Sequence, residues 1–166
     1  MKFKILGIFI ISVFFWAGGI KPVMAMVHTQ KNGLFNIDIP EEWHWVESPE
    51  EIIITYPDAK TVAIDIQLVH SKKLSQAAID KAIKESNDNM LKGVQAHNGA
   101  LIDNKEMKLD GVKAARLDFR TTLPNPIWVT YISFFNKGYA FTVTYGSEDD
   151  KIRSVMDDVV LTIKFK

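Results

Sequence analysis

The stretch IWVTYISFFNKGYAFTVTY, residues 127–145, predicts a β-hairpin, and the rest of the fold is built around it. Two runs rich in β-branched and aromatic residues flank Lys137 and Gly138, a pair typical of a tight turn. A loop of two residues and a loop of three residues, with Gly138 in a bulge, are both compatible with this sequence. The two loops give different strand registers.

With the two-residue loop, Phe134 pairs with Phe141 and Ile132 pairs with Val143. The same face also carries Trp128, Tyr139 and Tyr145. The opposite face sets large side chains against small ones, namely Val129, Tyr131 and Phe135 against Ala140, Thr142 and Thr144. Because both faces carry apolar groups, the sheet needs cover from helices or long loops on each side.

A second hairpin is predicted around Asp110-Gly111, which supplies the positive φ angles of a type I′ turn between residues 101–109 and 112–122. Further strands are predicted over residues 34–39, 51–56, 61–70 and 160–165. The expected fold class is α+β, with a mostly antiparallel sheet.

Two helices are predicted. The first runs from a cap at Ser75 to a stop at Gly93. Its apolar stripe is Ile79, Ile83, Met90 and Val94. The second begins where Ser147 and Asp150 have the spacing of a capping box, and its apolar residues are Ile152, Val155, Met156 and Val159.

The N-terminal 25 residues have the pattern of a secretory signal peptide. Lys2 and Lys4 precede a sixteen-residue apolar run, and small residues precede a cut after Ala25. An uncleaved membrane anchor is the alternative, but the run is shorter than the ~20 residues of a spanning helix. The sequence therefore predicts a single domain over residues 26–166, secreted or in the periplasm or cell envelope, with no stable membrane span after cleavage.

Charge and cysteine content exclude several classes of protein. The chain has 20 basic and 20 acidic residues, and removal of residues 1–25 takes away three lysines and no acid. The mature net charge of about −3, without a basic cluster, argues against nucleic-acid binding. The chain has no cysteine, so neither a lipid-anchored cysteine nor a disulfide is available.

Three segments resemble the PsbP-like family: residues 33–40 with Trp43, the hairpin ending at residues 138–145, and the capped helix that leads into residues 160–165. The resemblance implies an α+β fold with an antiparallel sheet of about six strands sandwiched by helices in α/β/α layers. Members of this family include extrinsic subunits of the oxygen-evolving photosystem, a nuclear partner of the Ran GTPase, and bacterial exported proteins. A secretory signal and a short N-terminal segment favour the exported group. The resemblance transfers no cofactor-binding residues.

The sequence predicts neither a cofactor nor a metal site. His28, His44, His70 and His97 are too widely spaced for the ligand pairs of structural metal sites, and His28 belongs to a segment expected to be mobile. Nucleophile motifs such as Gly-x-Ser-x-Gly are absent from the sequence, although a catalytic triad is defined by geometry and can escape sequence analysis. The predicted function is an exported non-catalytic binding or assembly module for a protein partner. A small secreted hydrolase is the alternative.

Two sets of residues are candidates for binding. Trp43 and Trp45 are interpreted as core residues that seal one end of the sheet, with an aromatic binding platform as the alternative. Arg116, Asp118 and Arg120 share one face of a strand, opposite Lys105 and Asp103. This face is interpreted as solvated, with weak ion pairs between its charged residues. The alternative is that the two arginines bind a carboxylate of the partner through bidentate hydrogen bonds.

Overall fold

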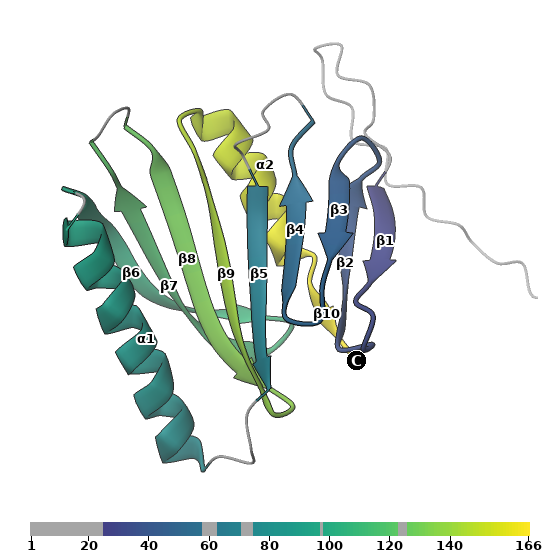
Figure 1. Ribbon diagram of the computed structural model, residues 1–166, viewed down its shortest axis with the longest axis horizontal. Coiled ribbons are helices and arrows are strands. Elements are labelled where there is room, and N and C mark those ends of the chain that lie inside the picture. The colour runs from purple at the N-terminus through teal and green to yellow at the C-terminus, as the bar shows by residue number, and fades with distance from the viewer. Residues whose placement is uncertain (1–24, 58–62, 71–74, 97, 123–125) are drawn as a thin grey trace, which may run out of the picture.

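The computed structural model describes residues 25–57, 63–70, 75–96, 98–122 and 126–166. The described residues form two sheets and two helices (Figure 1). The larger sheet has seven antiparallel strands in the order β3-β4-β5-β9-β8-β7-β6. Its strands are β3 (His44–Glu47), β4 (Glu51–Thr55), β5 (Ala63–His70), β6 (Ala100–Leu109), β7 (Val112–Arg120), β8 (Trp128–Asn136) and β9 (Tyr139–Ser147).

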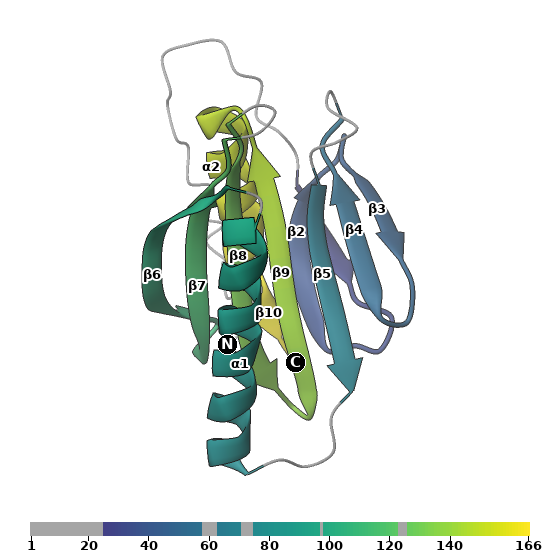
Figure 2. The same ribbon diagram turned by 60° about the vertical axis from the view of Figure 1, so that its left-hand side comes forward.

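The smaller sheet has the order β1-β2-β10 and consists of β1 (Ala25–Thr29), β2 (Phe35–Pro40) and β10 (Lys164–Phe165). Helix α1 (Gln76–Ala96) lies over β8 on one face of the larger sheet, and helix α2 (Asp150–Leu161) lies on the other face (Figure 2). The expected cover on both faces is therefore present, and the α+β class is confirmed.

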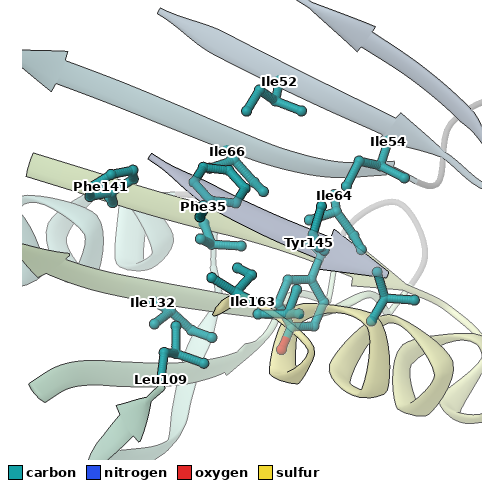
Figure 3. Close-up of a cluster of buried hydrophobic side chains, with 14 of the residues drawn as sticks. Phe35, Ile52, Ile54, Ile64, Ile66, Leu109, Ile132, Phe141, Tyr145 and Ile163 are labelled. Atoms are coloured by element: carbon teal, nitrogen blue, oxygen red, sulfur yellow. The ribbon is translucent and has the colours of Figure 1, made fainter. Parts of the chain in front are cut away.

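The main core lies between the larger sheet, the smaller sheet and α2. Phe35 of β2, Ile66 of β5 and Phe141 of β9 meet there with Tyr145 and Ile163 (Figure 3). Phe134 and Phe141 stack with their ring centres 4.8 Å apart. The core is thus built from residues that alternate along each strand, as half-buried strands require.

Both predicted hairpins are confirmed. Lys137 and Gly138 have φ angles of 48° and 84°, and Asp110 and Gly111 have φ angles of 45° and 83°. These positive angles at both central positions are those of a type I′ turn. The loop after β8 has two residues, so Phe134 pairs with Phe141 and Ile132 with Val143 as the shorter loop predicts.

Four details differ from the sequence predictions. The larger sheet has seven strands, close to the predicted six, and the described residues add a second sheet of three strands that was not predicted. The terminal segment with His28 is strand β1, because its backbone pairs with β2 from Ala25 to Thr29. Helix α1 continues through Gly93 to Ala96. Helix α2 is capped by Asp149, which accepts a hydrogen bond from the Lys151 amide, and it extends to Leu161.

The last strand of the chain is consequently shorter than predicted. Val160 and Leu161 complete α2, and β10 is limited to Lys164 and Phe165. The predicted strand over residues 61–70 is β5 from Ala63 onward, and its first two residues lie outside the described part of the chain. No helix among the described residues is long and apolar enough to span a bilayer.

Candidate functional site

Helix α1 is fastened to the sheet mainly by its C-terminal half. Val94 is the buried side chain of the helix, and Met90 and Leu91 pack beside it against Leu117 and Phe119 of β7. The helix is followed by Asn98, with φ of 57°, and Gly99, whose amide donates to the Val94 carbonyl at 2.8 Å. The helix therefore ends at this turn, after Ala96, rather than at Gly93 as predicted.

Two polar contacts hold the middle of α1. The hydroxyl oxygens of Ser86 and Tyr131 are 2.6 Å apart, and the Ser133 hydroxyl donates to Oδ1 of Asn87 at 2.8 Å. Burial raises the pKa of Tyr131, because the phenolate would lose its hydration. Ser86 and Asn87, two polar residues in the middle of the helix, thus face the sheet.

The N-terminal half of α1 stands over a groove of about 700 Å³ between the helix and strands β6 and β7, named here the α1 groove. Ile79 and Ile83 of the helix line it together with Ala115 and Phe135 of the sheet. All four are half-buried rather than enclosed. A second, smaller cavity of about 60 Å³ also lies beside Ile79 and Ile83.

The rim of the α1 groove is charged. The helix contributes Asp80, Lys84 and Asp88, and the strands contribute Glu106 and Lys113. Lys113 and Glu106 form an exposed ion pair with their charged atoms 2.8 Å apart. The rim therefore has both signs of charge, and the apolar floor is the part of the groove that a second molecule could desolvate.

A buried polar cluster lies on the other face of the sheet, beneath α2. The Arg116 guanidinium donates to Asp118 through Nε at 2.9 Å and Nη2 at 2.9 Å, and to Asp157 of α2 through Nη1 at 2.9 Å. Thr130 donates to Asp118 at 2.7 Å, and the hydroxyl of Tyr145 donates to Asp157. We name these five residues the Arg116 cluster.

Electrostatics within the Arg116 cluster favour its ion pairs. Burial opposes the charge on Arg116, but hydrogen bonds to Asp118 and Asp157 outweigh it and raise the pKa of Arg116. Burial likewise opposes ionisation of Asp118, and hydrogen bonds from Arg116 and Thr130 lower its pKa. Burial and the hydrogen bond to Asp157 raise the pKa of Tyr145. These pKa shifts keep Arg116 a cation, Asp118 a carboxylate and Tyr145 a neutral phenol at neutral pH.

The predicted register of this face is confirmed, because Arg116 pairs with Lys105 and Asp118 pairs with Asp103. The interpretation of the face as solvated is wrong for two of its residues. Arg116 is 9% exposed and Asp118 is 7% exposed, since α2 covers them and supplies Asp157. Asp157 was not among the predicted site residues, because the sequence distinguishes it only as an acid next to the apolar residue Met156.

Arg120, the third residue of that face, is exposed and does not join the Arg116 cluster. Its guanidinium carbon lies 5.0 Å from the ring centre of Trp128, its neighbour in register on β8. Arg153 of α2 lies 5.1 Å from the same ring centre. The structure therefore combines Arg120 with Trp128 and Arg153, a combination that strand periodicity alone does not reveal.

Trp43 and Trp45 occupy the positions expected of packing residues. Trp43 is buried in the main core, with its ring edge-to-face with Tyr56 at 5.2 Å. Trp45 is half-buried and stacks on His28 of β1, with ring centres 5.3 Å apart. His28 is thus part of the contact between the two sheets.

The other histidines lie apart from one another. His70 packs against Tyr139 with ring centres 5.0 Å apart, His44 is exposed on β3, and His97 lies outside the described residues. Within the described ranges, no three histidine, aspartate or glutamate side chains gather in a way that could hold a metal ion.

No family model matches the sequence, and no curated protein sequence matches it either. Solved structures are similar. The solution structure of cyanobacterial PsbP (CyanoP) from Synechocystis has a TM-score of 0.65 and 11% identity, covering 92% of this chain and 98% of that chain. The Ran-binding protein Mog1p of Saccharomyces cerevisiae has a TM-score of 0.56 and 8% identity, covering 85% and 95%.

LpqN of Mycobacterium tuberculosis, a protein involved in cell envelope biogenesis, has a TM-score of 0.51 and 16% identity, covering 84% of this chain and 90% of that chain. At these identities the similarity concerns the fold alone. The protein has a PsbP/Mog1-like α+β fold, which confirms the resemblance drawn from residues 33–40 with Trp43, residues 138–145, and the capped helix that leads into residues 160–165.

Proposed function

We propose that the protein is an exported, non-catalytic binding module that holds an apolar segment of a partner protein in the α1 groove. The observation that carries the proposal is that the two halves of α1 pack differently against the larger sheet. Its C-terminal half packs at Val94, whereas Ile79 and Ile83 face an open groove with an apolar floor. An apolar stripe that its own sheet does not cover is available to a second protein.

The composition of the α1 groove supports this role. Protein interfaces combine an apolar centre with a polar rim. Here Ala115 and Phe135 form part of the floor, and Asp80, Lys84 and Glu106 belong to the rim. A cavity of about 700 Å³ has room for several side chains of a partner. Similarity in fold to the Ran-binding protein Mog1p also favours a binding role.

The proposed compartment is the cell envelope or the outside of the cell. The apolar run before Ala25 and the small residues at the cut support export. The fold similarity to LpqN, involved in cell envelope biogenesis, agrees with this location. Mass spectrometry of the exported protein should find Met26 as the first residue. A protein retained in the membrane with Met1 intact would contradict the proposal.

Site-specific photo-cross-linking tests the groove directly. A benzoyl-phenylalanine in place of Lys84, on the rim, should cross-link a protein in envelope extracts. The same residue in place of Lys92, exposed on the same helix and outside the groove, should not cross-link that protein. Equal cross-linking from both positions would contradict a role for the groove.

A substitution that fills the α1 groove provides a second test of the proposal. Ala115→Leu places a larger side chain on the floor of the groove, and Ala77→Leu adds the same atoms to the exposed surface of α1. We expect the cross-link from position 84 to fall strongly in the first variant and to persist in the second. An unchanged cross-link in Ala115→Leu, with the fold intact by circular dichroism, would exclude insertion into the groove.

A further inference from the structure

The far end of the larger sheet carries a second cluster that the proposed function does not use. Arg120 is the last residue of β7, whereas the α1 groove reaches β7 near Lys113 and Ala115. Arg120 also belongs to the face under α2, opposite to the face that α1 covers. The cluster consists of Arg120, Trp128 and Arg153, and we name it the Arg-Trp-Arg site.

Both arginines of this site are held against one indole. Their guanidinium carbons lie 5.0 Å and 5.1 Å from the ring centre of Trp128. An arginine that stacks on an aromatic ring keeps its N–H groups free in the plane of the guanidinium. Trp128 therefore limits the motion of two cations without using their hydrogen-bond donors.

The two arginines are paired with acids of their own chain less completely than Arg116 is, as far as the described residues show. No described carboxylate lies within 4.0 Å of Arg120. Arg153 has a long ion pair with Asp150, whose Oδ1 lies 3.7 Å from Nε, and this Nε is buried without a hydrogen bond among the described residues. Arg116 differs sharply, since two carboxylates of its own chain bind it.

We propose that the Arg-Trp-Arg site binds an acidic peptide segment, with carboxylates of the peptide on Arg120 and Arg153 and its backbone against Trp128. Arg suits this task because its planar fork matches a carboxylate with two parallel hydrogen bonds. The site is independent of the α1 groove, so either site can fail its test without the other.

Nearby acids favour a peptide over a broad anionic surface. Asp149 caps α2 at the same end of the sheet, and Asp150 is exposed in the first turn. These carboxylates repel every anion, and they repel most strongly one that presents several charges close together, such as an anionic membrane or a doubly charged phosphate. A peptide whose carboxylates are well separated can bind the two arginines while Asp149 and Asp150 of the protein stay hydrated.

Fluorescence anisotropy with defined probes tests the site on the purified protein. The first probe is a fluorescein-labelled peptide of alternating glutamate and glycine, and the second has glutamine in place of glutamate. We expect the glutamate peptide to bind, and the glutamine peptide to bind at least roughly tenfold more weakly, because charged hydrogen bonds are lost. Equal affinity for the two peptides would overturn the proposal.

Variants locate the binding. Arg120→Gln with Arg153→Gln should weaken binding of the glutamate peptide roughly tenfold. Lys92→Gln removes the same kind of charge from the exposed face of α1 and should change the affinity less than about twofold. If the double variant binds as well as Lys92→Gln, the site is elsewhere. If the double variant misfolds, Arg120→Gln alone is used, because Arg120 is exposed and its replacement should leave the fold intact. A loss of affinity for the glutamate peptide under roughly twofold in this variant would overturn the proposal.

Two competitors separate the peptide from other anions. Inorganic phosphate should displace the glutamate peptide only at much higher concentration. In co-sedimentation with vesicles containing phosphatidylglycerol, the parent and the variant without Arg120 and Arg153 should sediment to the same small extent. Displacement by phosphate at equal concentration, or greater sedimentation of the parent than of the variant, would replace the peptide with a small anion or a lipid surface and overturn the proposal.

Discussion

Asp157 of α2 and Arg116 of β7 form an ion pair inside the domain, with Oδ1 of the carboxylate 2.9 Å from Nη1 of the guanidinium. The pair joins a helix near the end of the chain to a strand 41 positions earlier in the sequence. Around it, α2 is held by the apolar residues Met156, Val159 and Val160. The ion pair therefore sits inside an otherwise apolar contact, where the loss of one partner is costly.

Replacement of Arg116 by methionine should destabilise the protein by about 3 kcal/mol or more, because Asp118 and Asp157 would be left without a cation in a poorly solvated site. Urea unfolding measures the change. Lys105→Met is the control, since Lys105 is opposite Arg116 in register but its ion pair with Asp103 is exposed. The control should change the stability by less than ~1 kcal/mol. Similar losses in both variants would contradict the role of the Arg116 cluster.

Stability should fall in acid through Asp118. Hydrogen bonds from Arg116 and Thr130 outweigh burial and lower the pKa of Asp118 below that of the unfolded chain, about 3.9. A depressed folded pKa means that the stabilisation is complete above about pH 4 and is lost as the pH falls through the folded pKa. The difference in free energy of unfolding between the parent and Asp118→Asn should therefore shrink below about pH 4. A difference that stays constant from pH 7 to pH 3 would contradict this assignment.

Two glycine substitutions should have opposite effects. Gly93 is inside α1, and an added Cβ there would have no atom within 4 Å, so Gly93→Ala should stabilise the protein by about 0.5–1 kcal/mol. At Gly99 an added Cβ would lie 2.3 Å from Cγ1 of Val94 and 2.9 Å from its carbonyl oxygen. Gly99→Ala should therefore destabilise the protein, by roughly 1–3 kcal/mol. Thermal unfolding of both variants checks the sign of each change.

Hydrogen exchange should divide α1 into two halves. The helix packs against Leu117 and Phe119 around Val94, whereas Ile79 and Ile83 border the α1 groove. Because local opening is easiest where few apolar contacts are broken, amides near Ile83 should exchange faster than those near Val94. Ser86→Ala should speed exchange in the N-terminal half further, since it removes the contact with Tyr131. Uniform protection along the helix would contradict an open groove.

The sequence by itself determined the local features that depend on neighbours along the chain. Asp110-Gly111 and Lys137-Gly138 adopt the positive φ angles that their residue types favour, and each turn sets the register of its hairpin. The apolar faces of β8 and β9 followed from this register, as did the need for cover on both sides of the sheet. Alternation along a strand is a local property, so it can be read without a structure.

The tertiary structure decided which polar residues are buried and which meet. Periodicity put Arg116 and Arg120 on one face but could not show that α2 covers the first and leaves the second exposed. Asp157 is 41 positions from Arg116, and Arg153 is 33 positions from Arg120, so no local pattern links the members of either pair. Burial depends on where a distant helix packs, and that choice is made by the apolar contacts of Met156 and Val160 with the main core.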